Sequence, residues 1–321
     1  MVNNENSLKK KMAGKMGGYL ILVVLTVLSW AIFKIITPGN FGSLSNLVTY
    51  FESSLMISAG AVGFYFIIVT GMFDFSIGAN IMLSSILGTV LASRLGLGYV
   101  GLVAGCIVCS GLIGLITGIL YIKLRIPSMI VTVGLALIYE AIASLIAGGQ
   151  SATLDSSLRF FGKMPGNLIL ALIAFVVAYL LLNYTKIGTY TYAIGSNEFV
   201  AKNMGINVDK YKVIAFVISG IFLGIEAILT ISYGGSMVAE TGMASMGRNF
   251  YPTMGCFLGM AMKKNGIPIQ AIVIGEFFLQ IIYYGFVALG APTAINDVIS
   301  GLALLVIVTL TTKVNKGEIV K

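Results

Sequence analysis

The sequence predicts an all-α protein that crosses a membrane about ten times, and three observations lead to that prediction. Of the 321 residues, 58% are hydrophobic and only 10% are charged, whereas soluble proteins average about 25% charged residues. The apolar residues gather in runs of about 20, which is the length that an α-helix needs to cross a bilayer. Lysine and arginine collect between alternate runs. A chain with so little polar surface must place apolar side chains against lipid.

Ten apolar runs are interpreted as membrane-spanning helices. The eighth is short enough to be a re-entrant or broken segment, and the second and third are close enough to form a tight hairpin or one interrupted element. The first run follows several lysines, as in a signal peptide, but it is too long and no convincing cleavage site follows it, so we expect a retained helix. The predicted spans are 17–36, 52–71, 75–93, 98–122, 127–148, 166–184, 212–234, 249–262, 267–290 and 293–312.

The basic residues predict the orientation, because loops rich in lysine and arginine stay in the cytoplasm. With ten spans and a cytoplasmic N-terminus, 15 of the 20 basic residues fall on the cytoplasmic side and 5 on the outside. Residues 1–16 and 313–321 are then cytoplasmic tails on a membrane domain at 17–312. The net charge of +8 is thus explained by topology, and we expect no nucleic-acid partner.

The composition also excludes several kinds of chemistry. The chain has no histidine, which removes the common metal sites and histidine-based catalysis. Cys106 and Cys109 form a C-x-x-C, but small packing residues on a membrane helix are preferred over a redox or metal site. No G-x-x-x-x-G-K-[ST] is present, so we do not expect this chain to hydrolyse ATP. We predict no catalytic, cofactor-binding or metal-binding residues and interpret the chain as a non-enzyme.

Several acidic residues lie within or beside the spans, where a carboxylate is costly unless it faces a cavity or a partner. Asp74 lies between the second and third spans, and we expect it or Ser76 to cap the following helix, to line a pathway, or both. For the three glutamates, an internal hydrogen bond or a pore-lining position is favoured over proton transfer. The candidates for a translocation path are Asp74, Ser76, Glu140, Glu226 and Glu276.

The most polar stretch between spans is residues 185–211. Ser196 is expected to be the N-cap of a short helix that displays Phe199, Ala201 and Met204 and ends at Gly205. An exposed amphipathic helix of this kind suits docking in a groove on another protein, and a helix lying flat on the lipid surface is the alternative. The residues expected to carry the contact are Gly195, Asn197, Phe199, Ala201, Gly205 and Ile206.

Glycines spaced four residues apart recur along the spans. Because glycine has no Cβ, such pairs allow helices in lipid to approach closely. We expect tight helix packing at Gly101/Gly105, Gly114/Gly118, Gly220/Gly224 and Gly255/Gly259.

Three motifs in this order resemble the permease subunit of bacterial ABC importers for simple sugars, the ribose, galactose and xylose group of the branched-chain permease superfamily. Residues 71–78 are similar to the family's Gly-Gly-Ile-Asp-Leu-Ser-Val-Gly motif through Gly71, Asp74, Ser76 and Gly78. Residues 127–134 resemble its Pro-x-Phe-Ile-x-Thr-Leu-Gly segment, and residues 195–206 its Gly-x-Asn-x-x-Ala-Ala-x-x-x-Gly-Ile pattern. The resemblance spans about residues 45–235.

The C-terminal third diverges from this family. One glycine of each of two family doublets is absent, and Glu226 interrupts a helix that is usually apolar in these proteins.

The resemblance implies a division of labour. An extracytoplasmic binding protein delivers the solute, two permease subunits (identical or different) form the path, and two cytoplasmic ATPase subunits supply the energy. ATP and magnesium belong to the ATPase, and this chain needs no cofactor. ATP-driven closure would push the helix near 196–206 and switch the bundle between access states. The implied location is the bacterial cytoplasmic membrane, and a pentose, a hexose, a nucleoside or an autoinducer-type sugar derivative all remain open as cargo.

Two other functions are weighed against this one. An ion-coupled secondary transporter could use Glu140, Glu226 or Glu276, although no internal repeat is evident. A membrane-embedded enzyme has little support without histidine or clustered carboxylates.

Overall fold

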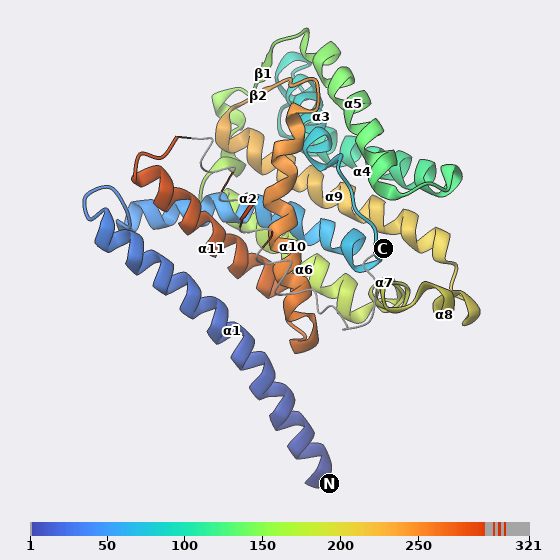
Figure 1. Cartoon of the computed structure of the whole chain (residues 1–321). Coiled ribbons are helices and arrows are strands. Elements are labelled where there is room, and N and C mark those ends of the chain that lie inside the picture. Colours follow the sequence, from blue (N-terminus) through green and yellow to red (C-terminus); the bar gives the residue numbers. More distant parts are fainter. Residues whose placement is uncertain (1, 293–297, 299–300, 303–304, 306–321) are drawn as a thin grey trace. The chain divides into compact units, whose positions relative to one another are not determined.

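The computed structural model describes residues 2–292, 298, 301, 302 and 305. Apart from one small sheet, this part of the chain is built from helices and the segments that connect them (Figure 1). The elements are α1 Val2–Ile36, α2 Leu44–Val69, α3 Ile77–Thr89, the π-helical turn η1 Val90–Arg94, α4 Gly98–Leu124, α5 Ser128–Ala147, β1 Ser151–Thr153, η2 Ser156–Leu158, η3 Phe160–Gly162, α6 Gly166–Tyr184, α7 Lys186–Ser196, α8 Glu198–Asn203, α9 Val208–Gly234, β2 Ser236–Val238, η4 Ala244–Asn249, α10 Phe250–Met262, η5 Lys263–Asn265 and α11 Pro268–Ala288.

Within the described residues, eight helices are long and apolar enough to cross a membrane. They are α1 from Gly17 onward, α2, α3 with η1, α4, α5, α6, α9 and α11. Helix α10 has 13 residues and rises only about 20 Å, well short of the ~30 Å hydrocarbon core, which agrees with the expectation of a short eighth segment. The tenth predicted span, 293–312, falls almost entirely outside the described residues, and the predicted tail 313–321 does so completely.

Helix α2 begins eight residues before the predicted span at 52–71. Its first turn is capped by Ser43, whose Oγ accepts a hydrogen bond from the Asn46 backbone N–H at 3.2 Å. Thr49 donates a hydrogen bond to the carbonyl oxygen of Ser45 one turn earlier. These polar residues are fully helical, but they hide the start of the helix from a search for apolar runs.

The described chain divides into two compact units. One comprises residues 52–252 and is called here the central unit, and the other comprises residues 1–51 with 253–321.

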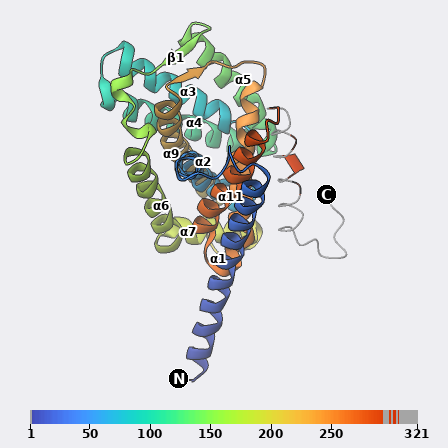
Figure 2. The same cartoon turned by 90° about the vertical axis from the view of Figure 1, so that its left-hand side faces the viewer.

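Helices α3, α4 and α9 pack against one another within the central unit (Figures 1 and 2). Helices α4 and α9 meet at glycines whose missing Cβ atoms leave room for the backbone of the other helix. A Cβ at Gly220 would collide with the carbonyl oxygen of Ser110, and the Ser110 hydroxyl donates a hydrogen bond to the Gly220 carbonyl at 2.5 Å. The glycines of this interface are Gly114, Gly118, Gly220 and Gly224.

The remaining predicted glycine pairs also make close contacts. Gly105 packs against Gly88 of α3. In the other unit, Gly255 and Gly259 of α10 face Glu276 and Ile272 of α11. The packing predicted from glycine spacing is therefore confirmed.

Burial separates the helices of the central unit into inner and outer ones. In the most apolar 18-residue stretch of α9, 78% of the residues are buried, whereas in that of α6 only 39% are buried. Large apolar side chains such as Leu172, Val176 and Leu180 of α6 are exposed on its outer face, as expected for a surface that faces lipid.

A two-stranded antiparallel sheet ties the end of α9 to the segment after α5. Ser151 pairs with Val238 and Thr153 with Ser236. The Arg159 guanidinium donates hydrogen bonds to the carbonyl oxygen of Leu154 and, at 3.3 Å, to that of Gly235. These bonds hold one end of the central unit together.

In the other unit, α1 packs along α11. The contact is aromatic, since Phe33 of α1 meets Phe286 of α11 edge to face at 5.2 Å between ring centroids. Tyr50, in the second turn of α2, also stacks on Tyr284 of α11, with centroids 4.5 Å apart. Gly285 makes room for the Phe33 ring.

Candidate functional site

The predicted docking segment contains two helices, α7 and α8, instead of one. Thr185 caps α7 by accepting a hydrogen bond from the Ile187 N–H at 3.2 Å. The prediction that Ser196 caps the short helix is wrong, because the Ser196 hydroxyl donates back to the Tyr192 carbonyl inside α7. Asn197 has an extended backbone and caps α8 instead, and its Oδ1 accepts from the Val200 N–H at 3.0 Å.

Gly205 ends α8, as predicted. Its φ of 82° lies in the left-handed region, and the next residue, Ile206, donates from its N–H to the Ala201 carbonyl at 3.1 Å. This is the hydrogen-bond pattern of a glycine-terminated helix.

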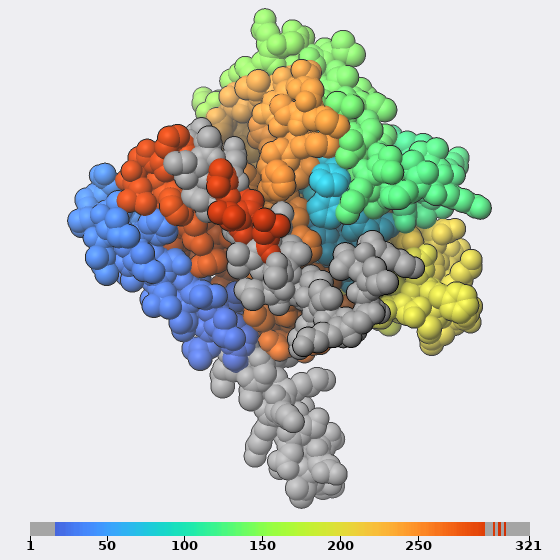
Figure 3. Space-filling model, in the orientation of Figure 1, coloured from blue at the N-terminus to red at the C-terminus, as the bar shows by residue number. Residues whose placement is uncertain are grey.

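Helix α8 has a surface side and a buried side. Phe199 is 73% exposed and Met204 is 76% exposed. Ala201, which was expected on the surface, is buried against Ile194 and Val208, because a helix this short needs one residue to attach it to the bundle. Beside α8 lies a groove with both apolar and polar lining. Its lining includes Tyr190, Met204, Ile206, Lys210 and Tyr211. The part of the chain that carries α8 and the start of α9 is coloured yellow in Figure 3.

The other end of this segment rests on α2. A Cβ at Gly195 would collide with the carbonyl oxygen of Val69, the last residue of α2. The docking segment therefore contacts the point where the chain leaves α2 and enters the stretch that contains Asp74.

A second polar site lies between α2 and α3. The Asp74 carboxylate accepts hydrogen bonds from the backbone N–H of Ser76 at 2.7 Å and from its hydroxyl at 2.6 Å. The same stretch is held by α5, because the Phe73 N–H donates to Ser128 Oγ and the Phe75 N–H donates to Thr132 Oγ1. Residues 71–78 and 127–134, two of the motifs noted in the sequence, are thus bonded to each other.

The cap on α3 comes from a residue far along the chain. The Gly78 N–H donates to Oδ1 of Asn249 at 2.6 Å, and Nδ2 of Asn249 donates to the Phe75 carbonyl at 2.6 Å. Ser76 makes no side-chain cap bond, and Asp74 bonds to Ser76 ahead of the helix. The expected cap from Asp74 or Ser76 is therefore wrong, since the polar residue that satisfies the helix start comes from η4.

Glu140 anchors the same η4 segment. Its two carboxylate oxygens accept hydrogen bonds from the backbone N–H groups of Met243 at 2.8 Å and Ser245 at 2.9 Å. Glu140 is almost fully buried, so these bonds replace the water that its charge would otherwise need. The internal hydrogen bonding expected of this residue is confirmed.

Glu226 is the least satisfied carboxylate of the central unit. It is 5% exposed, and its Oε2 has no hydrogen-bond partner among the described residues. That oxygen lies against Gly60 of α2, where any side chain would take its place.

Glu276 lies in the other unit. It is fully buried on α11 and faces Gly255 of α10. The structure thus brings Asp74, Ser76 and Glu140 to one hydrogen-bonded region around α3 and η4, whereas Glu276 belongs to a different unit.

The site contains residues that the sequence analysis missed: Asn249, Glu198, Lys212 and Tyr121. Lys212 lies in the second turn of α9, directly before the long apolar stretch of that helix, and is 7% exposed. A buried lysine at the edge of an apolar stretch requires a partner. That signal could have directed a search for Glu198, whose carboxylate forms an ion pair with Lys212 at 2.9 Å.

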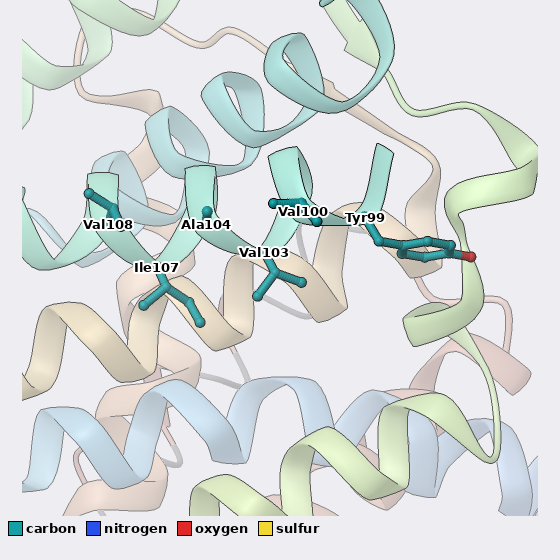
Figure 4. A pocket seen from close by; sticks show the side chains of 6 residues that line it. All are labelled: Tyr99, Val100, Val103, Ala104, Ile107 and Val108. Atoms are coloured by element: carbon teal, nitrogen blue, oxygen red, sulfur yellow. The ribbon is translucent and has the colours of Figure 1, made fainter. Parts of the chain in front are cut away.

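An apolar groove runs along one side of α4 (Figure 4). Its polar group, the Tyr99 hydroxyl, donates to the carbonyl oxygen of Ser157 at 2.7 Å. The groove includes none of the predicted path residues, and its lining suits a lipid acyl chain better than a polar solute. The lining residues are Tyr99, Val100, Val103, Ala104, Ile107 and Val108.

Loss of the Asn249 cap should destabilise the protein measurably. Asn249→Leu leaves the Gly78 N–H and the Phe75 carbonyl without this partner, and we expect a cost of about 2 kcal/mol or more. Asn249→Asp retains an acceptor for Gly78 but has no donor for Phe75, so a smaller loss is expected. Thermal denaturation in detergent measures both changes. A wild-type melting temperature for Asn249→Leu would contradict the assignment of the cap.

A bundle of apolar helices with buried polar groups and a short exposed helix between two spans is typical of multi-pass membrane transport proteins. The chain belongs to the family described as branched-chain amino acid transport system / permease component, which matches residues 46–308. The match continues well beyond residue 235, so the family relationship includes most of the divergent C-terminal third.

Individual relatives are similar over nearly the whole chain. The autoinducer 2 import system permease protein LsrC of Yersinia pseudotuberculosis serotype O:3 is 29% identical, over 90% of this chain and 82% of the relative. The ribose import permease protein RbsC of Escherichia coli K12 is 26% identical, over 91% of this chain and 92% of the relative. The L-arabinose ABC transporter permease protein AraH of Azospirillum brasilense is 26% identical, over 90% of this chain and 84% of the relative. All three are transport permeases, in line with the prediction of a non-enzyme.

A solved structure shares the fold. It is an ABC transporter of the metal-chelate type in an inward-facing conformation, with a TM-score of 0.53 and 15% identity, over 94% of this chain and 100% of that one.

Proposed function

We propose that this chain is the permease subunit of an ATP-driven importer that carries a simple sugar or a sugar-like solute across the bacterial cytoplasmic membrane. The observation that carries the proposal is helix α8, which is bounded by Asn197 and Gly205 and presents Phe199 and Met204 to the outside. An exposed apolar pair on a short helix suits a groove on a partner. Relatives named for autoinducer 2, ribose and L-arabinose import support the solute class.

The basic residues support an orientation with α8 in the cytoplasm. Lys212 of α9 bonds to Tyr121 of α4 and to Glu198 of α8, which places the end of α4 beside the start of α8, and the segments at these ends carry several basic residues. They are Lys123, Arg125, Lys186, Lys202, Lys210 and Lys212. With the ten spans predicted from the sequence, both chain termini are also cytoplasmic, and the β1–β2 sheet faces the extracytoplasmic side.

The proposed complex has three kinds of component. Two permease subunits, identical or different, enclose the path. Two cytoplasmic ATPase subunits bind ATP and magnesium and contact α8, and an extracytoplasmic binding protein delivers the solute. Specificity among pentoses, hexoses, nucleosides and sugar derivatives then rests mainly with the binding protein.

Affinity purification tests the docking part of this proposal. The full chain, tagged and produced together with the ATPase of the same importer, should purify as a complex. The double variant Phe199→Ser/Met204→Ser should lose most of the bound ATPase, because the contact loses its two exposed apolar side chains.

Phe160→Ser is the matched control for this experiment. Phe160 is also exposed, at 51%, but it lies near the β1–β2 sheet at the opposite end of the central unit. Equal loss of the ATPase in both variants, or no loss in either, would contradict a docking role for α8.

A second candidate function, ion-coupled transport, draws on one observation. Glu226 is buried, and its Oε2 has no hydrogen-bond partner among the described residues, which is a typical setting for a carboxylate that takes up a proton or a cation. Uptake by the purified chain alone in liposomes, driven by a proton or sodium gradient and lost in Glu226→Gln, would favour this function over the first.

A further inference from the structure

A buried lysine, Lys212, joins α8 to the neighbouring ends of α4 and α9. Nζ of Lys212 donates hydrogen bonds to both carboxylate oxygens of Glu198, each at 2.9 Å, and to the Tyr121 hydroxyl at 3.3 Å. An ammonium group has three N–H donors, so these three oxygens satisfy it completely. Glu198 is the first residue of α8, Tyr121 lies in the last turn of α4, and Lys212 lies near the start of α9.

Helix α8 has few other attachments to the bundle. It contains six residues, and its buried apolar contact is Ala201 with Ile194 and Val208. Asn197 and Gly205 turn the chain sharply at its two ends. A helix of this length is not stable by itself, so its position depends on these few tertiary contacts, and the Lys212 contact is the charged one.

Helices α4 and α9, which hold Tyr121 and Lys212, form a closely packed pair. Their glycine interface brings backbone against backbone along several turns, and the Tyr121 ring also contacts Phe216 of α9, with centroids 5.9 Å apart. Helices packed in this way move together, because a shift of one would force the backbone of the other. A displacement applied to α8 at Glu198 therefore reaches both helices at once.

The contact differs from an ordinary surface ion pair, which contributes little. Glu198 is half exposed, but only 9% of the Lys212 side chain is exposed. The lysine has lost most of its water and depends on Glu198 and Tyr121, whereas the glutamate can follow a partner that moves α8.

We propose that Glu198, Lys212 and Tyr121 form a clamp that transmits the movement of α8 to α4 and α9 during transport. Lys212 is a positioning residue in this scheme, since it acts through Glu198 and not on the solute. The proposal rests on the function proposed above and identifies the residues through which the ATPase acts on the bundle.

The experiment compares solute uptake with ATP hydrolysis. The full chain, its ATPase and its binding protein are reconstituted in proteoliposomes, and uptake per ATP hydrolysed is measured. Glu198→Gln and Lys212→Met should retain bound, active ATPase, but uptake per ATP should fall about tenfold, because a charged hydrogen bond is lost. The exchanged pair Glu198→Lys/Lys212→Glu should recover part of the ratio.

Asp209→Asn is the matched control, because it removes an exposed carboxylate in the first turn of α9, and it should leave uptake per ATP unchanged. A wild-type ratio in Glu198→Gln would overturn the clamp, and so would loss of the ATPase itself from that variant, which would make Glu198 a docking residue. If the wild-type complex shows no ATP-dependent uptake, the proposed function fails instead.

Discussion

Replacement of Gly205 by glutamate should abolish binding of the ATPase while the permease remains inserted in the membrane. Gly205 adopts a φ of 82°, and a residue with a Cβ pays roughly 1–2 kcal/mol for that conformation. A Cβ there meets no atom within 4 Å, so the bundle itself is not disturbed. The strain instead weakens the end of α8, and the new carboxylate enters the groove beside Met204 and Ile206. Membrane fractionation and pull-down of the ATPase measure the two outcomes.

Gly205→Asn provides the control, because asparagine tolerates the left-handed conformation better than other residues with a Cβ and adds no charge. It should retain most of the ATPase. Unchanged pull-down with Gly205→Glu would count against α8 as the docking helix.

Replacement of Gly220 by valine should prevent the protein from accumulating as a folded bundle. A Cβ at this position would collide with the carbonyl oxygen of Ser110, and a backbone atom cannot rotate away as the end of a side chain can. The two helices must separate, which breaks the hydrogen bond from Ser110 to the Gly220 carbonyl and opens the interface. We expect a loss of about 3 kcal/mol, at the upper end of what overpacking costs because the obstacle is backbone, measured as a reduced yield and melting temperature in detergent.

Gly111→Val tests whether this effect is local. Gly111 lies on α4 next to Ser110, but a Cβ there meets only Ile221 at an ordinary contact distance of 3.5 Å. It should therefore be tolerated. If Gly220→Val were as stable as Gly111→Val, the close packing of α4 on α9 would be wrong.

The apolar pattern predicted helices well where a whole helix must be apolar because it crosses the lipid bilayer. The fourth, fifth and sixth spans were placed within about two residues at both ends, and α1 ends at Ile36 as predicted for the first span, although the helix begins at Val2. The start of α2 and the whole of α7 were missed, because their turns carry serine, asparagine, threonine and tyrosine that are stabilised by caps and tertiary contacts instead of lipid. Gly205 was correctly predicted to end α8, since its role depends on local backbone conformation.

The polar contacts were harder to predict because they join distant parts of the chain. Asn249 caps a helix that begins 172 residues earlier, and Glu140 binds backbone N–H groups more than 100 residues away. Backbone donors carry no sequence signal. Asp74 and Ser76 were recognised as polar residues at a helix start, but only the fold reveals that α3 receives its cap from η4.

The most direct test of the central claim, that a separate ATPase powers this permease through α8, is solute uptake into proteoliposomes. With the ATPase and the binding protein present, uptake of the solute that the binding protein carries should require ATP and should stop when vanadate is added. Without the ATPase, the chain should not accumulate solute under an imposed proton or sodium gradient. Gradient-driven accumulation by the chain alone, insensitive to vanadate, would contradict the account.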